Sequence, residues 1–126
     1  MKCVLDASAL LAFLQDEPGS EAVENVLEEA SISAVNWSEV VQKSVGSGVD
    51  INGMREELEA LGVSIAPFDQ AQAEATGLLW KKTKRHGLSL GDRACLCLGK
   101  SLKATVFTAD RVWKKLKIGV DIQVLR

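Results

Sequence analysis

Four acidic residues occupy positions from which they could act together on a phosphate ester. They are Asp6, Glu39, Asp92 and Asp110, and each follows a short apolar stretch or begins a helix. In open parallel sheets, binding sites form beyond the C-terminal ends of the strands, so these positions bring all four acids to one edge. Because crowded carboxylates repel one another, this convergence indicates a site where a divalent cation neutralises them.

The chemistry of such a site follows from its oxygen ligands. Oxygen-only ligands select hard cations, and Mg²⁺ or Mn²⁺ held by carboxylates is the usual arrangement for phosphate-ester chemistry. The ion would polarise the phosphate and activate water, and one or two ions would serve. His86 is the only histidine, which disfavours a zinc site. It also disfavours a metal-free ribonuclease, because such enzymes normally use histidines as general acid and base.

Each acid also has a purely structural interpretation, because Asp and Glu are common at helix N-termini. Asp6 could cap a helix, and Ser89 stands three residues before Asp92 as a possible capping-box partner. Glu39 could simply lie in a first helical turn, and Asp110 could be a turn residue. The expected convergence of the four favours function, and both interpretations stay open at this point.

Short apolar strands alternate with helices along the chain. Strands are expected at 2–5, 32–35, 63–66, 105–108 and 122–125. Because parallel neighbours need crossover helices, this alternation predicts an α/β domain with a mainly parallel sheet flanked by helices.

Helices are expected from the residue after Ser8, over 20–30, after Asn36 as a cap, at 54–61, at 71–79, at 94–102 and around Trp113. Gly62 should end one of them in a left-handed conformation. In the helix that carries Ala71 and Ala75, both Leu78 and Leu79 are expected to face inward.

The composition is that of one compact domain, residues 1–126. The 126 residues are 47% hydrophobic and 25% charged. No apolar run is long enough to span a bilayer and no signal segment is present, so we expect a cytoplasmic protein that does not contact a membrane. Three unpatterned cysteines fit a reducing compartment, where Cys3, Cys95 and Cys97 would be buried.

The formal net charge of −2 hides a division along the chain. Residues 1–79 hold three Lys/Arg and fourteen Asp/Glu, a net charge of −11, whereas residues 80–117 hold eleven Lys/Arg against two Asp, a net charge of +9. Such clustered cations can bind a phosphate backbone. The densest run, and our candidate RNA-binding segment, is Lys81, Lys82, Lys84 and Arg85. A solvated face with cations at a helix C-terminus remains the alternative.

The segment 87–91, Gly-Leu-Ser-Leu-Gly, matches the nucleophile-elbow pattern of serine hydrolases. That pattern requires a strand before the serine and a histidine later in the chain. Here a polar loop precedes Ser89 and the only histidine, His86, lies upstream, so serine hydrolysis is disfavoured.

Four segments resemble, in the correct order, the motifs of PIN-domain toxins of the VapC type: residues 4–12, 37–40, 88–94 and 107–110. The resemblance spans nearly the whole chain. It implies a five-stranded parallel sheet and Mg²⁺- or Mn²⁺-dependent endoribonuclease activity on structured RNA. It also implies a homodimer, inhibition by a cognate antitoxin, and a place in a bacterial or archaeal toxin–antitoxin pair. The family's catalytic metal ligands would correspond to Asp6, Glu39, Asp92 and Asp110, with Ser8 and Thr108 as supporting polar residues.

Other classes fit less well. A phosphoacceptor receiver domain needs adjacent acids after the first strand and a lysine near the last, but Ala7 and Ser8 follow Asp6 and the last strand has no lysine. A haloacid-dehalogenase-like phosphatase would need an aspartate where Ser8 stands. A catalytically silent PIN-like module that binds RNA or a partner remains open.

Overall fold

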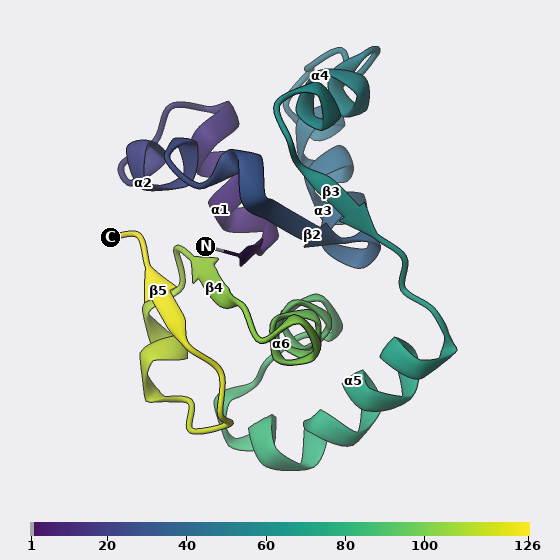
Figure 1. Ribbon diagram of the computed structural model, residues 1–126, viewed down its shortest axis with the longest axis vertical. Helices are drawn as coiled ribbons and strands as arrows, with labels where there is room; N and C mark the ends of the chain where they lie inside the picture. The colour runs from purple at the N-terminus through teal and green to yellow at the C-terminus, as the bar shows by residue number, and fades with distance from the viewer. Residues whose placement is uncertain (1) are drawn as a thin grey trace.

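The structure is a computed structural model that describes residues 2–126. Its centre is a five-stranded sheet with the strand order β3-β2-β1-β4-β5, and all four pairings are parallel (Figure 1). The strands are β1 (Cys3–Leu5), β2 (Ala30–Ser33), β3 (Ser64–Ala66), β4 (Thr105–Thr108) and β5 (Ile122–Val124). The expected α/β class is therefore confirmed.

Helices connect consecutive strands, as parallel pairing requires. The α-helices are α1 (Ala7–Leu14), α2 (Ser20–Glu24), α3 (Ala34–Gly46), α4 (Met54–Ala60), α5 (Gln70–Thr83) and α6 (Leu90–Leu102). Three short 3-10 helices are η1 (Leu27–Glu29), η2 (Lys84–His86) and η3 (Arg111–Lys115). None of the helices in the described part of the chain is long and apolar enough to cross a bilayer.

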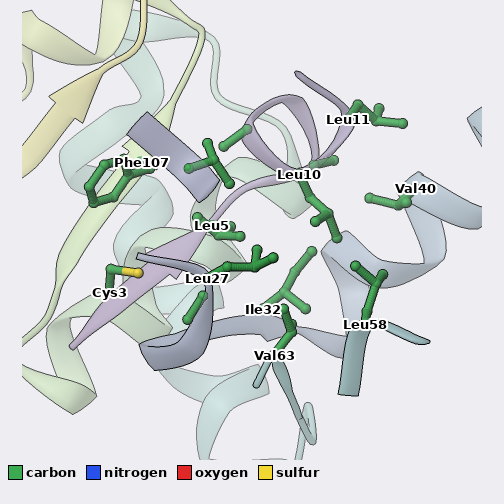
Figure 2. Close-up of a cluster of buried hydrophobic side chains, with 14 residues drawn as sticks. Cys3, Leu5, Leu10, Leu11, Leu27, Ile32, Val40, Leu58, Val63 and Phe107 are labelled. Atoms are coloured by element: carbon green, nitrogen blue, oxygen red, sulfur yellow. The ribbon is translucent and has the colours of Figure 1, made fainter. Parts of the chain in front are cut away.

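All three residues of the central strand β1 are buried. Because successive side chains of a strand point to opposite faces of the sheet, they pack into two separate cores. Cys3 and Leu5 belong to the core under α1 to α4, which Figure 2 shows with Leu10 and Ile32 around Leu5. Val4 belongs to the second core, under α6 and η3. Packing against both cores holds β1 in place, and with it Asp6, the residue that follows its C-terminal end.

Helix α3 packs against both α1 and α6. It therefore connects the helix that follows Asp6 with the helix that contains Asp92. Its N-cap is Ser33, whose Oγ accepts a hydrogen bond from Val35 N at 3.2 Å. The expectation that Asn36 caps this helix was wrong, because β2 ends at Ser33 and the chain turns directly into α3. Asn36 instead lies inside the helix.

The helix expected over 20–30 is also shorter than its apolar period suggested. Helix α2 ends at Glu24, and Ala30 already pairs with Cys3 in the sheet. The chain continues through η1 and enters the sheet at Ala30, where strand pairing overrides the helical period, while Val23 and Leu27 remain buried.

Leu78 is 79% exposed although Leu79 is 7% exposed. Neighbours on a helix cannot both face one partner, and α5 packs chiefly against α6. The expectation that both leucines face inward was therefore wrong for Leu78.

Two local expectations are confirmed. Gly62 has φ +107°, and a Cβ there would lie 2.6 Å from Glu28 Cα, so both backbone conformation and space require glycine. The three cysteines are free and buried.

Candidate metal centre and active site

Asp6 follows β1 and caps α1. It is therefore both a structural residue and a residue at the C-terminal edge of the sheet, where the site is expected. Its Oδ1 accepts hydrogen bonds from Ala9 N at 2.8 Å and from Ser8 Oγ at 2.7 Å. Its Oδ2 accepts one from Thr108 Oγ1 at 2.6 Å. The carboxylate is held on both sides and is only 6% exposed.

Burial raises the pKa of Asp6 to about 6, although the hydrogen bonds from Thr108, Ser8 and Ala9 lower it. The negative charge of Asp92 raises this pKa further. Ionised Asp6 is therefore costly, and a cation at this position would relieve both the burial and the repulsion.

Ser8 and Thr108 tie the end of β4 to Asp6. Ser8 Oγ accepts from Ala109 N at 2.9 Å, and Thr108 Oγ1 accepts from Asp110 N at 3.0 Å. Asp110 is exposed and caps η3 by accepting from Val112 N at 2.9 Å. The structure thus places Asp110 close in the hydrogen-bond network to Asp6, through Thr108.

Asn36 joins Glu39 to the residue before Asp92, a role that the sequence analysis missed. Its Nδ2 donates to Glu39 Oε1 at 2.9 Å and to Gly91 O at 3.0 Å, which connects α3 to the first turn of α6. Both partners are acceptors, so the amide orientation is fixed. Asn36 is 1% exposed, and among residues 2–126 its Oδ1 has no hydrogen-bond partner. The spacing of Asn36 and Glu39, three residues on one helix face, was the available signal.

Asp92 forms the expected capping box at the start of α6. Ser89 Oγ accepts from Asp92 N at 3.1 Å, and Asp92 Oδ2 accepts from Ser89 N at 3.0 Å. Among the residues that the structure describes, no donor is hydrogen-bonded to Oδ1. Asp92 is therefore a capping residue that still has a carboxylate oxygen free for a ligand.

Cys95, which is buried on α6, reports where the carboxylate charges meet. Its pKa lies well above the ordinary value, first because of burial and then because of the charges of Asp6, Asp92 and Glu39. The charges of three acids from different parts of the chain therefore all raise the pKa of one buried thiol.

The four acidic side chains do not form a complete set of metal ligands in this structure. Within residues 2–126, no three or more His, Cys, Asp or Glu side chains lie so that they could hold a metal ion together. Hydrogen bonds engage Asp6, Glu39, Asp92 and Asp110, and the four would have to approach further to share a cation.

Gly91 leaves the space that Glu39 occupies. A Cβ at position 91 would lie 2.6 Å from Glu39 Oε1. Gly91→Ala should preserve the fold, because the obstructing atom ends a flexible side chain and Ala favours helix by about 1 kcal/mol. It should displace Glu39 and lower the rate of a reaction catalysed at this site at least about tenfold, the equivalent of 1.36 kcal/mol.

Gly77→Ala on α5 is the matched control, because a Cβ there meets nothing within 4 Å. It should raise stability similarly and leave the reaction rate unchanged. Melting temperatures and reaction rates of both variants test this, and equal activity in the two would remove Glu39 from the site.

The cations of the basic run form a second feature of the molecule. Lys81, Lys82, Lys84 and Arg85 line a hollow of about 430 Å³ together with His86, Lys115 and Lys117. Lys115, which ends η3, and Lys117, two residues later, were not expected there.

A model of the PIN domain matches residues 3–119. The chain belongs to the PIN-domain family.

Comparison with solved structures gives the same fold along nearly the whole chain. DNA-bound VapBC from Salmonella typhimurium has a TM-score of 0.74 at 16% identity, covering 100% of this chain and 99% of that one. A toxin–antitoxin complex from Klebsiella pneumoniae has a TM-score of 0.71 at 18% identity, covering 94% and 95%. FitAcB from Neisseria gonorrhoeae has a TM-score of 0.67 at 23% identity, covering 95% of each chain. A search of curated proteins finds no match.

Proposed function

We propose that this PIN-domain chain is a Mg²⁺- or Mn²⁺-dependent endoribonuclease that hydrolyses structured RNA. The observation that carries the proposal is the position of Glu39 against Gly91, the residue before Asp92, where Asn36 holds it by hydrogen bonds. The negative charges of Glu39, Asp92 and Asp6 all raise the pKa of the buried Cys95 thiol. Asp110 joins them through its backbone hydrogen bond to Thr108. The raised pKa of buried Asp6 indicates an acid that lacks a counter-charge.

The donor set fits a hard cation, because all four side chains offer carboxylate oxygens. Asp6, Glu39, Asp92 and Asp110 would hold the ion. When bound, it would polarise the phosphate and lower the pKa of a bound water.

The surrounding residues would position the ligands. Ser8 and Thr108 orient the Asp6 carboxylate, and Asn36 orients Glu39 toward the first turn of α6. No histidine serves as general base in this proposal, since His86 lines the basic hollow. Lys81, Lys82, Lys84 and Arg85 would bind RNA phosphates.

The likeness to a toxin–antitoxin complex supports the role of toxin in such a pair, with a cognate antitoxin as partner. A homodimer and a cytoplasmic location stay predictions. A second candidate is a catalytically silent PIN-like binding module, favoured by the absence of a ready ligand group within residues 2–126.

One experiment separates the two candidates. Purified protein is incubated with structured RNA in Mn²⁺, in Mg²⁺ and in chelator, beside His86→Ala. We expect cleavage with either cation, none in chelator, and full activity in His86→Ala. Cleavage that persists in chelator, or that disappears in His86→Ala, would contradict the mechanism. Binding without cleavage under every condition would favour the silent module.

A further inference from the structure

The basic hollow is built by two segments that lie far apart in the sequence. One is the end of α5 with η2, which supplies Lys81, Lys82, Lys84, Arg85 and His86. The other is the end of η3 with the residues just after it, which supply Lys115 and Lys117. The fold therefore gathers six cations and a histidine around one space of about 430 Å³.

Buried neighbours hold these cations outward. Trp113, Leu116 and Ile118 are buried in the second core, so the residues between them, Lys115 and Lys117, face solvent. On α5, Thr83 is the buried neighbour of the exposed cations, and its hydroxyl donates to Leu79 O at 3.0 Å.

The hollow lacks counter-charges. Its lining contains no acidic side chain, and in the described part of the chain none of its six cations forms a salt bridge. Six like charges around one space repel one another, and an anionic ligand with several charges would relieve that repulsion.

The ligand chemistry that fits is a phosphate backbone. A protein partner normally needs an apolar centre in its interface, where lysine is depleted. Every residue that lines this hollow is Lys, Arg or His. Such a lining suits the many evenly spaced charges of a nucleic acid and contains no apolar side chain to bury.

Both segments also lead directly to the carboxylates. Lys115 lies five residues after Asp110 along η3, a span of roughly 10 Å at the 3-10 rise. On the other side, η2 leads into the loop before Ser89 and Asp92. An RNA strand at the carboxylates would therefore reach the hollow with phosphates only a few nucleotides away.

We propose that the hollow is an anchoring site for RNA phosphates outside the carboxylate centre, and that Lys115 and Lys117 form one of its walls. This inference rests on the proposed function. The site is not sequence-specific, because backbone contacts carry no base information. It favours substrates long enough to occupy both places, so short oligonucleotides gain nothing from it.

The test is the salt dependence of RNA binding by Lys115→Ala/Lys117→Ala, measured in chelator by fluorescence anisotropy of a labelled structured RNA. The log–log slope should fall by about 0.7–0.9 for each phosphate that the variant no longer neutralises, and thus by up to about 1.8. Affinity for a two-nucleotide oligomer should not change. Lys115→Arg/Lys117→Arg should retain the slope.

Lys2→Ala/Lys100→Ala is the matched control, because it removes two exposed lysines that do not line the hollow. A slope and affinity equal to this control would overturn the inference while leaving the nuclease proposal intact. The same holds if Lys115→Ala/Lys117→Ala weakens binding of an acidic polypeptide such as polyglutamate but keeps the slope for RNA. If the unaltered protein neither bound nor cleaved RNA, the proposed function would fail, and the inference with it.

Discussion

Asp92→Asn is expected to lower the rate of RNA cleavage by about three orders of magnitude, because a lost metal ligand removes several kcal/mol of transition-state stabilisation at 1.36 kcal/mol per tenfold. The fold should persist. The asparagine oxygen can still accept the hydrogen bond that Asp92 Oδ2 accepts from Ser89 N at 3.0 Å. Single-turnover cleavage rates with saturating Mn²⁺, together with melting curves, measure both effects.

Asp69→Asn is the matched control for the capping role. Asp69 caps α5 by accepting from Gln72 N at 2.9 Å, is exposed, and lies outside the site. The two variants should have similar stability, within about 1 kcal/mol. Comparable activity in both would mean that Asp92 is a capping residue and nothing more.

Asp6→Asn should change the pH dependence of stability in the metal-free protein. The pKa of Asp6 is raised from 3.8 to about 6 in the folded state, chiefly by burial. Between these values the folded state binds more protons than the unfolded state, so this residue lowers stability as pH rises through that window. A shift of about two units corresponds to about 3 kcal/mol.

The asparagine cannot ionise, so this dependence should disappear. Its oxygen can keep the bonds from Ala9 N and Ser8 Oγ, and its amide can donate to Thr108 Oγ1. In chelator, the free energy of unfolding of the variant relative to the unaltered protein should therefore rise by about 2.4 kcal/mol between pH 4 and pH 7. Urea unfolding at a series of pH values measures this difference.

The increase in stability on adding Mn²⁺ is a second measurement that tests the role of Asp6. A cation that binds only the folded protein stabilises it by an amount that follows the logarithm of its concentration over Kd, so the gain should be smaller in Asp6→Asn. A variant that loses equal stability with and without Mn²⁺, at every pH, would show that Asp6 serves only as a helix cap.

Local patterns in the sequence predicted the elements that carry the acids. A short apolar strand followed by an acid places Asp6 and Asp110 at the same edge, because parallel strands share their direction. The three-residue spacing of Ser89 and Asp92 likewise predicted the capping box that the structure contains.

Contacts between distant segments could not be predicted in this way. The bond from Asn36 to Gly91 O spans 55 residues, and nothing near Asn36 indicates that α6 will lie beside it. Gly91 has no left-handed backbone conformation, so only the carboxylate of Glu39 explains why a side chain would not fit. Lys115 and Lys117 join the basic run only because Trp113 in η3 and Leu116 just after it pack into the second core.

The most direct test of the metal centre is a crystal structure grown with Mn²⁺, with anomalous diffraction measured at the manganese edge. The account predicts an anomalous peak at the C-terminal edge of the sheet, with oxygens of Asp6, Asp92 and at least one of Glu39 and Asp110 at a coordination distance of about 2.0–2.3 Å. A peak bound elsewhere, or no peak at saturating Mn²⁺, would contradict it.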